Sequence, residues 1–134
     1  MNLSEKSDEN MGLVENCLRK DKFMNAVVSR VYYAVFQKMK HYLIENEFDY
    51  GEFKHEINAE NQDDFSHGTI YMATRQCYIM KHRDFNFDTL SVFDRVSNLY
   101  KARITADYKE DIDYDRRSVT RFCDSAKSIM QLLD

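Results

Sequence analysis

The chain has 134 residues, enough for a single domain with one hydrophobic core, and we expect one domain over residues 1–134. It contains no proline and only three glycines, which favours an all-helical protein, because sheets and their turns usually need more of both. No apolar run approaches the roughly 20 residues of a membrane span, and no signal-peptide pattern precedes the acidic first segment. A cytoplasmic protein without a membrane span is therefore expected.

The formal net charge of −4 is unevenly distributed and argues mildly against non-specific nucleic-acid binding. Residues 45–64 hold eight acids and one lysine, a local charge of −7, so subtracting this from −4 leaves +3 for the remainder. One acidic and one mildly basic face are compatible with RNA contact on one side. A solvated acidic loop explains the same distribution.

Apolar residues at spacings of three and four predict the first two helices. The first is expected over about residues 4–21, with Ser4 or Ser7 as its N-cap, and a short break follows at residues 19–22. The second, over about 23–45, is apolar around more than half its circumference. We expect it to be central, in contact with several neighbours or with a second subunit.

The remaining chain is predicted to contain one long loop and three helices. Residues 46–62, acidic and rich in asparagine, are expected to form that loop, which could contain a short helical turn. Helices are expected over about 63–80, with Asp63 or Asp64 near the N-cap, over about 87–110, capped by Asn86, and over about 115–133. The predicted fold is an all-α, up-and-down bundle of four to five helices.

The helix predicted over 87–110 carries charges on its apolar face. The stripe over residues 90–99 continues onto Arg103 and Asp107, where leucines would be expected, and Tyr108 follows about 100° around the helix. Arg103 and Asp107 are spaced to form a structural ion pair. Alternatively, an arginine at a cleft can bind a phosphate bidentately and stabilise the charge that develops in phosphoryl transfer.

A second polar group interrupts the most apolar helix. Ser29 and Tyr33 are one turn apart, and Arg30 is adjacent to Tyr33 at a spacing of three. These side chains are candidates for binding a substrate. Hydrogen bonds between packed helices, made by buried hydroxyls, are the structural alternative.

Arg75 and His82 form a third candidate pair, separated by six residues. Histidine suits acid–base chemistry, but His82 falls in a predicted connector, where an exposed histidine is ordinary. The other histidines lack the spacing of a zinc site, and the acids of residues 45–64 lack the glycine and spacing of a calcium loop. We expect neither a metal nor another cofactor.

The three cysteines, Cys17, Cys77 and Cys123, are odd in number and widely spaced, and none forms a CxxC pair. Each lies in or beside an apolar helical stripe. Buried free thiols in a reducing compartment are therefore expected, with a catalytic cysteine as the minor alternative.

Two motifs together resemble a known family. The segment from Ser29 to Phe36 reads S-R-V-Y-Y-A-V-F and resembles the S-x-x-Y-Y-A-x-F signature of the second helix in small prokaryotic HEPN-domain proteins. The segment from Arg103 to Tyr108 reads R-I-T-A-D-Y and is similar to the R-x-x-A-D-Y signature of one branch of that family. The order and spacing of both motifs fit, and the resemblance covers nearly the whole chain.

The resemblance implies an all-α homodimer with the polar motif at the bottom of the dimer cleft. Many HEPN proteins are metal-independent ribonucleases of toxin–antitoxin, CRISPR or abortive-infection systems, often encoded beside a small nucleotidyltransferase antitoxin. It therefore implies that Arg103, Asp107 and Tyr108 act on RNA or a nucleotide, and that Ser29, Arg30 and Tyr33 assist in binding it.

The chain departs from the family's nuclease motif, which consists of an arginine, four to six intervening residues and then a histidine. After four intervening residues comes Tyr108, and Lys109 and Glu110 occupy the next two positions. Arg75 and His82 satisfy the spacing, but one helix too early. Ribonuclease activity is therefore a secondary expectation beside RNA or nucleotide binding, and the competing class is a non-catalytic helical module that binds a protein partner.

Overall fold

A computed structural model of the chain describes residues 2–59, 67–109 and 111–134. Those ranges contain six helices and no strand: α1 (Leu3–Lys20), α2 (Met24–Glu45), α3 (Tyr50–Glu56), α4 (His67–Lys81), α5 (Phe87–Tyr108) and α6 (Arg116–Leu132). The all-α helical bundle predicted from composition and periodicity is confirmed. The helix beyond the predicted count is α3, which lies in the stretch expected to be mainly loop.

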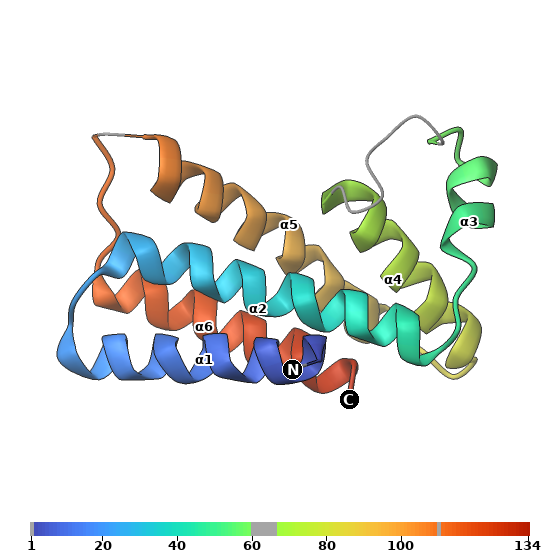
Figure 1. Cartoon of the computed structure of the whole chain (residues 1–134), viewed down its shortest axis with the longest axis horizontal. Helices are drawn as coiled ribbons and strands as arrows, with labels where there is room; N and C mark the ends of the chain where they lie inside the picture. Colours follow the sequence, from blue (N-terminus) through green and yellow to red (C-terminus); the bar gives the residue numbers. More distant parts are fainter. Residues whose placement is uncertain (1, 60–66, 110) are drawn as a thin grey trace.

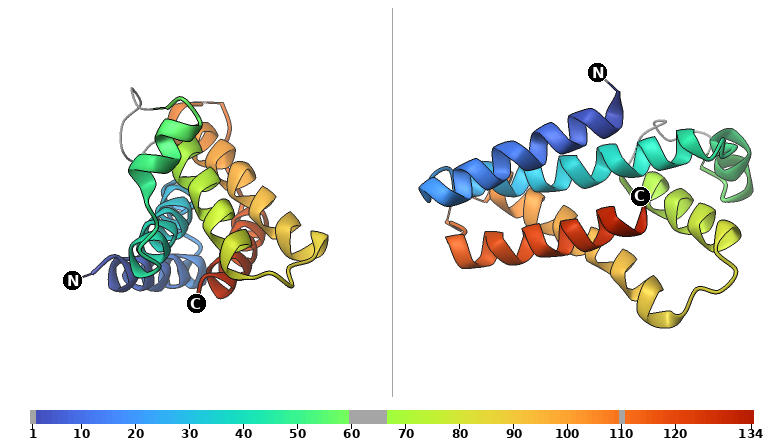
Figure 2. Two further views of the ribbon diagram at one scale, coloured as in Figure 1. Left: turned by 90° about the vertical axis from the view of Figure 1, so that its right-hand side faces the viewer. Right: turned by 90° about the horizontal axis from the view of Figure 1, so that it is seen from below.

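Helix α2 is the centre of the bundle, as its apolar circumference predicts. It packs against α1, α4, α5 and α6. In Figure 1, α1 and α6 lie on one side of α2, while α4 and the C-terminal half of α5 lie on the other. The end-on view in Figure 2 shows α3 and α4 together at one end of the bundle. The N-terminal half of α2 is thereby left facing the C-terminal half of α5.

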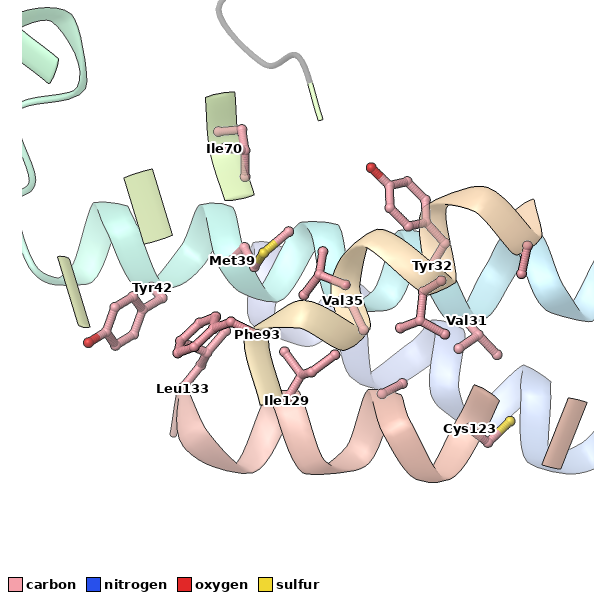
Figure 3. Close-up of a cluster of buried hydrophobic side chains, with 14 of the residues drawn as sticks. Val31, Tyr32, Val35, Met39, Tyr42, Ile70, Phe93, Cys123, Ile129 and Leu133 are labelled. Carbon is pink, nitrogen blue, oxygen red and sulfur yellow. The ribbon is translucent and has the colours of Figure 1, made fainter. Parts of the chain in front are cut away.

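One hydrophobic core draws side chains from all six helices. Val31, Val35 and Met39 of α2 are fully buried, and Figure 3 shows Val35 beside Ile129 of α6 and Val31 beside Cys123 of the same helix. Burial of such side chains supplies most of the favourable free energy of folding. The packing fixes the register of α2 against α5, and this register decides which polar residues meet.

The start of α1 corrects the predicted cap. Asn2 is the N-cap: its side chain accepts from the backbone N–H of Glu5, whose carboxylate accepts from the backbone N–H of Asn2. Ser4 lies inside the helix. Ser7 is fully buried and donates to the carbonyl of Ala34 at 2.7 Å, so it links α1 to α2.

The other predicted caps have different outcomes. Asn86 caps α5 by accepting from the backbone N–H of Thr89, as predicted. The predicted cap at Asp63 or Asp64 lies outside the described residues. Asp49 caps α3 by accepting from the backbone N–H of Glu52, and Phe53 anchors this short helix in the core.

The cysteines are free thiols: Cys17 is half-buried, and Cys77 and Cys123 are buried. Burial raises the pKa of the Cys77 thiol, and it raises the pKa of Cys123 to about 11. Neither buried thiol is therefore activated as a nucleophile. Across the residues that the structure describes, no helix combines the length and apolar character needed to cross a membrane.

Candidate functional site

The packing of α2 on α5 brings four of the predicted polar residues together. Ser29 and Tyr33, one turn apart on α2, face Arg103 and Asp107, one turn apart on α5. Arg103 Nη2 donates to the Tyr33 hydroxyl at 2.8 Å, and the Ser29 hydroxyl donates to Asp107 Oδ1. We call these four residues the Arg103 cluster.

The guanidinium of Arg103 lies against two aromatic rings. Its Cζ is 5.3 Å from the ring centroid of Tyr33 and 5.9 Å from that of Tyr32. Both distances are within the range of a cation–π interaction. Burial, together with the neighbouring Tyr100, raises the pKa of Tyr32, although Arg103 opposes the shift, so the Tyr32 phenol stays protonated at neutral pH.

The guanidinium retains donors for a further ligand. Its Nε lies 3.1 Å from Asp107 Oδ2, which is an ion pair, but the angles do not make a hydrogen bond and the Nε–H is buried. A guanidinium has five N–H groups. The bond to Tyr33 is the one hydrogen bond that Arg103 donates among the described residues. The cluster can therefore present fixed donors to an anion arriving from solvent.

The cluster is close to the surface but is not fully exposed. The side chains of Arg103 and Asp107 are 18% and 30% exposed, and Tyr33 is 38% exposed. Partial burial strengthens the electrostatic field of the guanidinium, since the surrounding dielectric is lower than that of water. Asp107 fixes the orientation of Arg103 and offsets part of its charge.

Two predicted residues lie apart from the cluster. Tyr108 is 70% exposed and lies at the last position of α5, so its side chain faces solvent. Arg30 turns away toward α1, where its Nη1 lies 3.5 Å from Asn10 Oδ1. Both lie next in sequence to a cluster residue, so the 100° step of the helix places them on another face.

Arg75 and His82 belong to a different part of the molecule. The ring of His82 stacks on Tyr78 at 4.3 Å, and Tyr78 in turn contacts Phe93 of α5. Phe93 precedes Arg103 by ten residues, which is about 15 Å along a helix. The fold therefore does not bring the Arg75–His82 pair to the Arg103 cluster.

Comparison with known proteins gives no relative. No protein-family model, curated protein or solved structure matches the chain. The resemblance to HEPN proteins consequently rests on the two motifs alone.

The sequence motifs predict the four cluster residues but not the contact of Arg103 with the ring of Tyr32. The signal for Tyr32 is its position next to Tyr33, because two side chains 100° apart on one helix can flank a group on the facing helix. The described part of the chain contains no group of three or more His, Cys, Asp or Glu side chains that could hold a metal ion.

Proposed function

We propose that the protein is a cytoplasmic HEPN-domain homodimer of a prokaryotic defence or toxin–antitoxin module, and that its Arg103 cluster binds a phosphate of RNA or of a nucleotide. The supporting observation is the guanidinium itself. It is held by Tyr33 and Asp107 and flanked by two aromatic rings, and it has donors left for a ligand. An arginine restrained in this way is suited to recognising a phosphate. A nucleotidyltransferase antitoxin is the protein partner that the resemblance implies.

Exposed apolar side chains at the same end of the molecule support the dimer. Phe23 and Tyr108 are 72% and 70% exposed, and Ile112 is 40% exposed. Ile112 is tied to α2, because Asn25 Nδ2 donates to its carbonyl at 3.3 Å. A two-fold axis beside these side chains would cover them and bring two Arg103 clusters into one cleft.

Metal-independent RNA cleavage is a second candidate function at the same site. In this reaction the ribose 2′-oxygen bonds to the adjacent phosphorus and the bond to the 5′-oxygen breaks, which yields a 2′,3′-cyclic phosphate and a 5′-hydroxyl. Arg103 would stabilise the negative charge of the transition state, and the Asp107 carboxylate beside it would accept the 2′-hydroxyl proton. The proton delivered to the leaving oxygen would come from the Tyr33 hydroxyl or from water.

RNA binding can be tested directly with a matched pair of variants. Arg103→Met keeps the aliphatic part of the side chain on the tyrosines, and Arg95→Met removes an exposed arginine from the same helix. Fluorescence anisotropy with a labelled single-stranded RNA should show about tenfold weaker binding for Arg103→Met, which corresponds to one lost charged contact. Equal binding by the wild type and by both variants would contradict the proposal and favour the non-catalytic interaction module.

Cleavage and oligomeric state are measured separately. Incubation of the same RNA in EDTA should yield products with a cyclic phosphate if the protein is a ribonuclease, and Arg103→Met should abolish them. Intact RNA at all protein concentrations would refute the nuclease function without affecting the binding proposal. Sedimentation should give twice the chain mass of 16.0 kDa, and a monomer at micromolar concentration would refute the dimer.

A further inference from the structure

A pocket at the opposite end of α2 has a chemistry of its own. The cavity, of about 420 Å³, lies where the C-terminal half of α2 meets the ends of α4 and α6. Tyr42, in its wall, follows Ser29 by thirteen residues, which is about 20 Å along a helix. Figure 3 shows Tyr42 at this end of the core, near Leu133 and with its hydroxyl directed away from Phe93. The pocket is therefore separate from the Arg103 cluster.

The hydroxyl of Tyr42 is an unused donor. The residue is only 5% exposed, and none of the described residues supplies a hydrogen-bond partner for its hydroxyl. Most buried polar groups have a partner, so an exception calls for an explanation. Burial raises the pKa of Tyr42 to about 12, so the phenol keeps its proton and can donate at neutral pH.

Two lysines, Lys38 and Lys81, line the same pocket as Tyr42. Lys38 is only 7% exposed, and its Nζ pairs with the carboxylate of Asp134. The Nζ of Lys81, from the end of α4, lies 5.9 Å from the ring centroid of Tyr42 and donates to Asn46 Oδ1. A buried lysine is costly to keep charged without anionic partners.

The two carboxylates at the pocket lie mainly in solvent. The side chain of Asp134 is 67% exposed and comes after the end of α6, so it can leave Lys38 without disturbing a helix. Glu45 is 65% exposed and lies 3.7 Å from Nε2 of His41. When Asp134 leaves, the lysines outnumber the remaining carboxylate, and His41 and His82 add two imidazole rings that can donate.

We propose that this pocket binds a phosphoryl group, which replaces the Asp134 carboxylate on Lys38 and accepts hydrogen bonds from the Tyr42 hydroxyl and Lys81. A tetrahedral group with three or four oxygens can reach two ammonium groups and a hydroxyl at once, whereas the Asp134 carboxylate pairs with Lys38 alone. Free phosphate and a phosphate monoester present the same group. The inference is independent of the function proposed for the Arg103 cluster.

Calorimetric titration with inorganic phosphate and with methyl phosphate tests the pocket. Asp134→Asn removes the competing carboxylate and should tighten binding, whereas Tyr42→Phe should weaken it by about threefold to tenfold, the equivalent of one hydrogen bond. Lys127→Met, which removes a lysine paired with Glu15 at 3.4 Å outside the pocket, should bind as the wild type does. Tighter binding of methyl phosphate would identify a monoester as the ligand, and tighter binding of inorganic phosphate would identify free phosphate.

Three results would overturn the proposal: no saturable binding of either probe, unchanged affinity in Tyr42→Phe, or weaker binding by Asp134→Asn. Tyr42→Phe retains the ring and Asp134→Asn lies beyond the last helix, so both variants should fold. Heteronuclear NMR spectra of each variant confirm folding. They also locate the probe, because resonances of residues 38–46 should shift on titration while those of residues 29 and 103 should not.

Discussion

The stability of Arg103→Met distinguishes a surface-facing binding group from a buried structural ion pair. In the wild type, Arg103 donates a charge-assisted hydrogen bond to Tyr33, and such a bond contributes about 1.5–3 kcal/mol. The ion pair of Arg103 with Asp107, four residues along the helix, adds about 0.3–0.5 kcal/mol. Methionine keeps the apolar contact with the rings, and removing the guanidinium relieves part of its desolvation. We expect a loss of about 2 kcal/mol, compared with about 3–5 kcal/mol for breaking a fully buried pair.

Urea unfolding followed by circular dichroism measures this difference, and a thermal scan should show a Tm lower by about 8 °C. Arg95→Met, an exposed arginine on the same helix, should change the free energy of unfolding by less than about 0.5 kcal/mol. A loss of about 4 kcal/mol or more, together with unchanged RNA binding, would show that Arg103 serves the fold alone and would refute our interpretation of the cluster.

Other variants test contacts at single helix pairs. Ser29→Ala removes the donor to Asp107 and should cost about 1 kcal/mol in urea unfolding; no change would show that the contact is absent in solution. Ser7→Ala should cost about 1–2 kcal/mol, because the hydroxyl is fully buried and bonded to a backbone carbonyl of α2. The thiol of Cys123 should react with iodoacetamide more slowly than half-buried Cys17 at pH 8, since burial raises its pKa to about 11 and keeps it protonated below that pH. Its reaction should accelerate as the pH approaches 11, and fast labelling at pH 8 in the folded protein would contradict the packing of α6.

Five of the six helices could be predicted because their apolar positions recur at helical spacing over four or more turns. Helix α3 was expected only as a short helical turn within the loop, since its seven residues offer little periodicity and are flanked by acids that are typical of a loop. The cap of α1 was assigned wrongly because serines were favoured over Asn2 and Glu5, whose reciprocal capping pattern is present in the sequence. The buried role of Ser7 depends on α2 and is not visible in local sequence.

The Arg103 cluster was partly predictable because each half is a local motif on one helix. Arg103 with Asp107, and Ser29 with Tyr33, are i to i+4 pairs, and their meeting follows from the packing of α2 on α5. The pocket around Tyr42 corresponds to no local sequence motif. Its residues come from three helix ends and converge only in the folded chain, so neither periodicity nor spacing could group them.

The most direct test of the central claim is the salt dependence of RNA binding. For a single-stranded RNA, the logarithm of the binding constant falls with the logarithm of salt concentration by about 0.7 for each phosphate neutralised. If Arg103 contacts a phosphate, Arg103→Met should reduce that slope by about 0.7 per cluster engaged, whereas Arg95→Met should leave it unchanged. Identical slopes for the wild type and Arg103→Met would contradict the assignment of the Arg103 cluster as a phosphate-binding site.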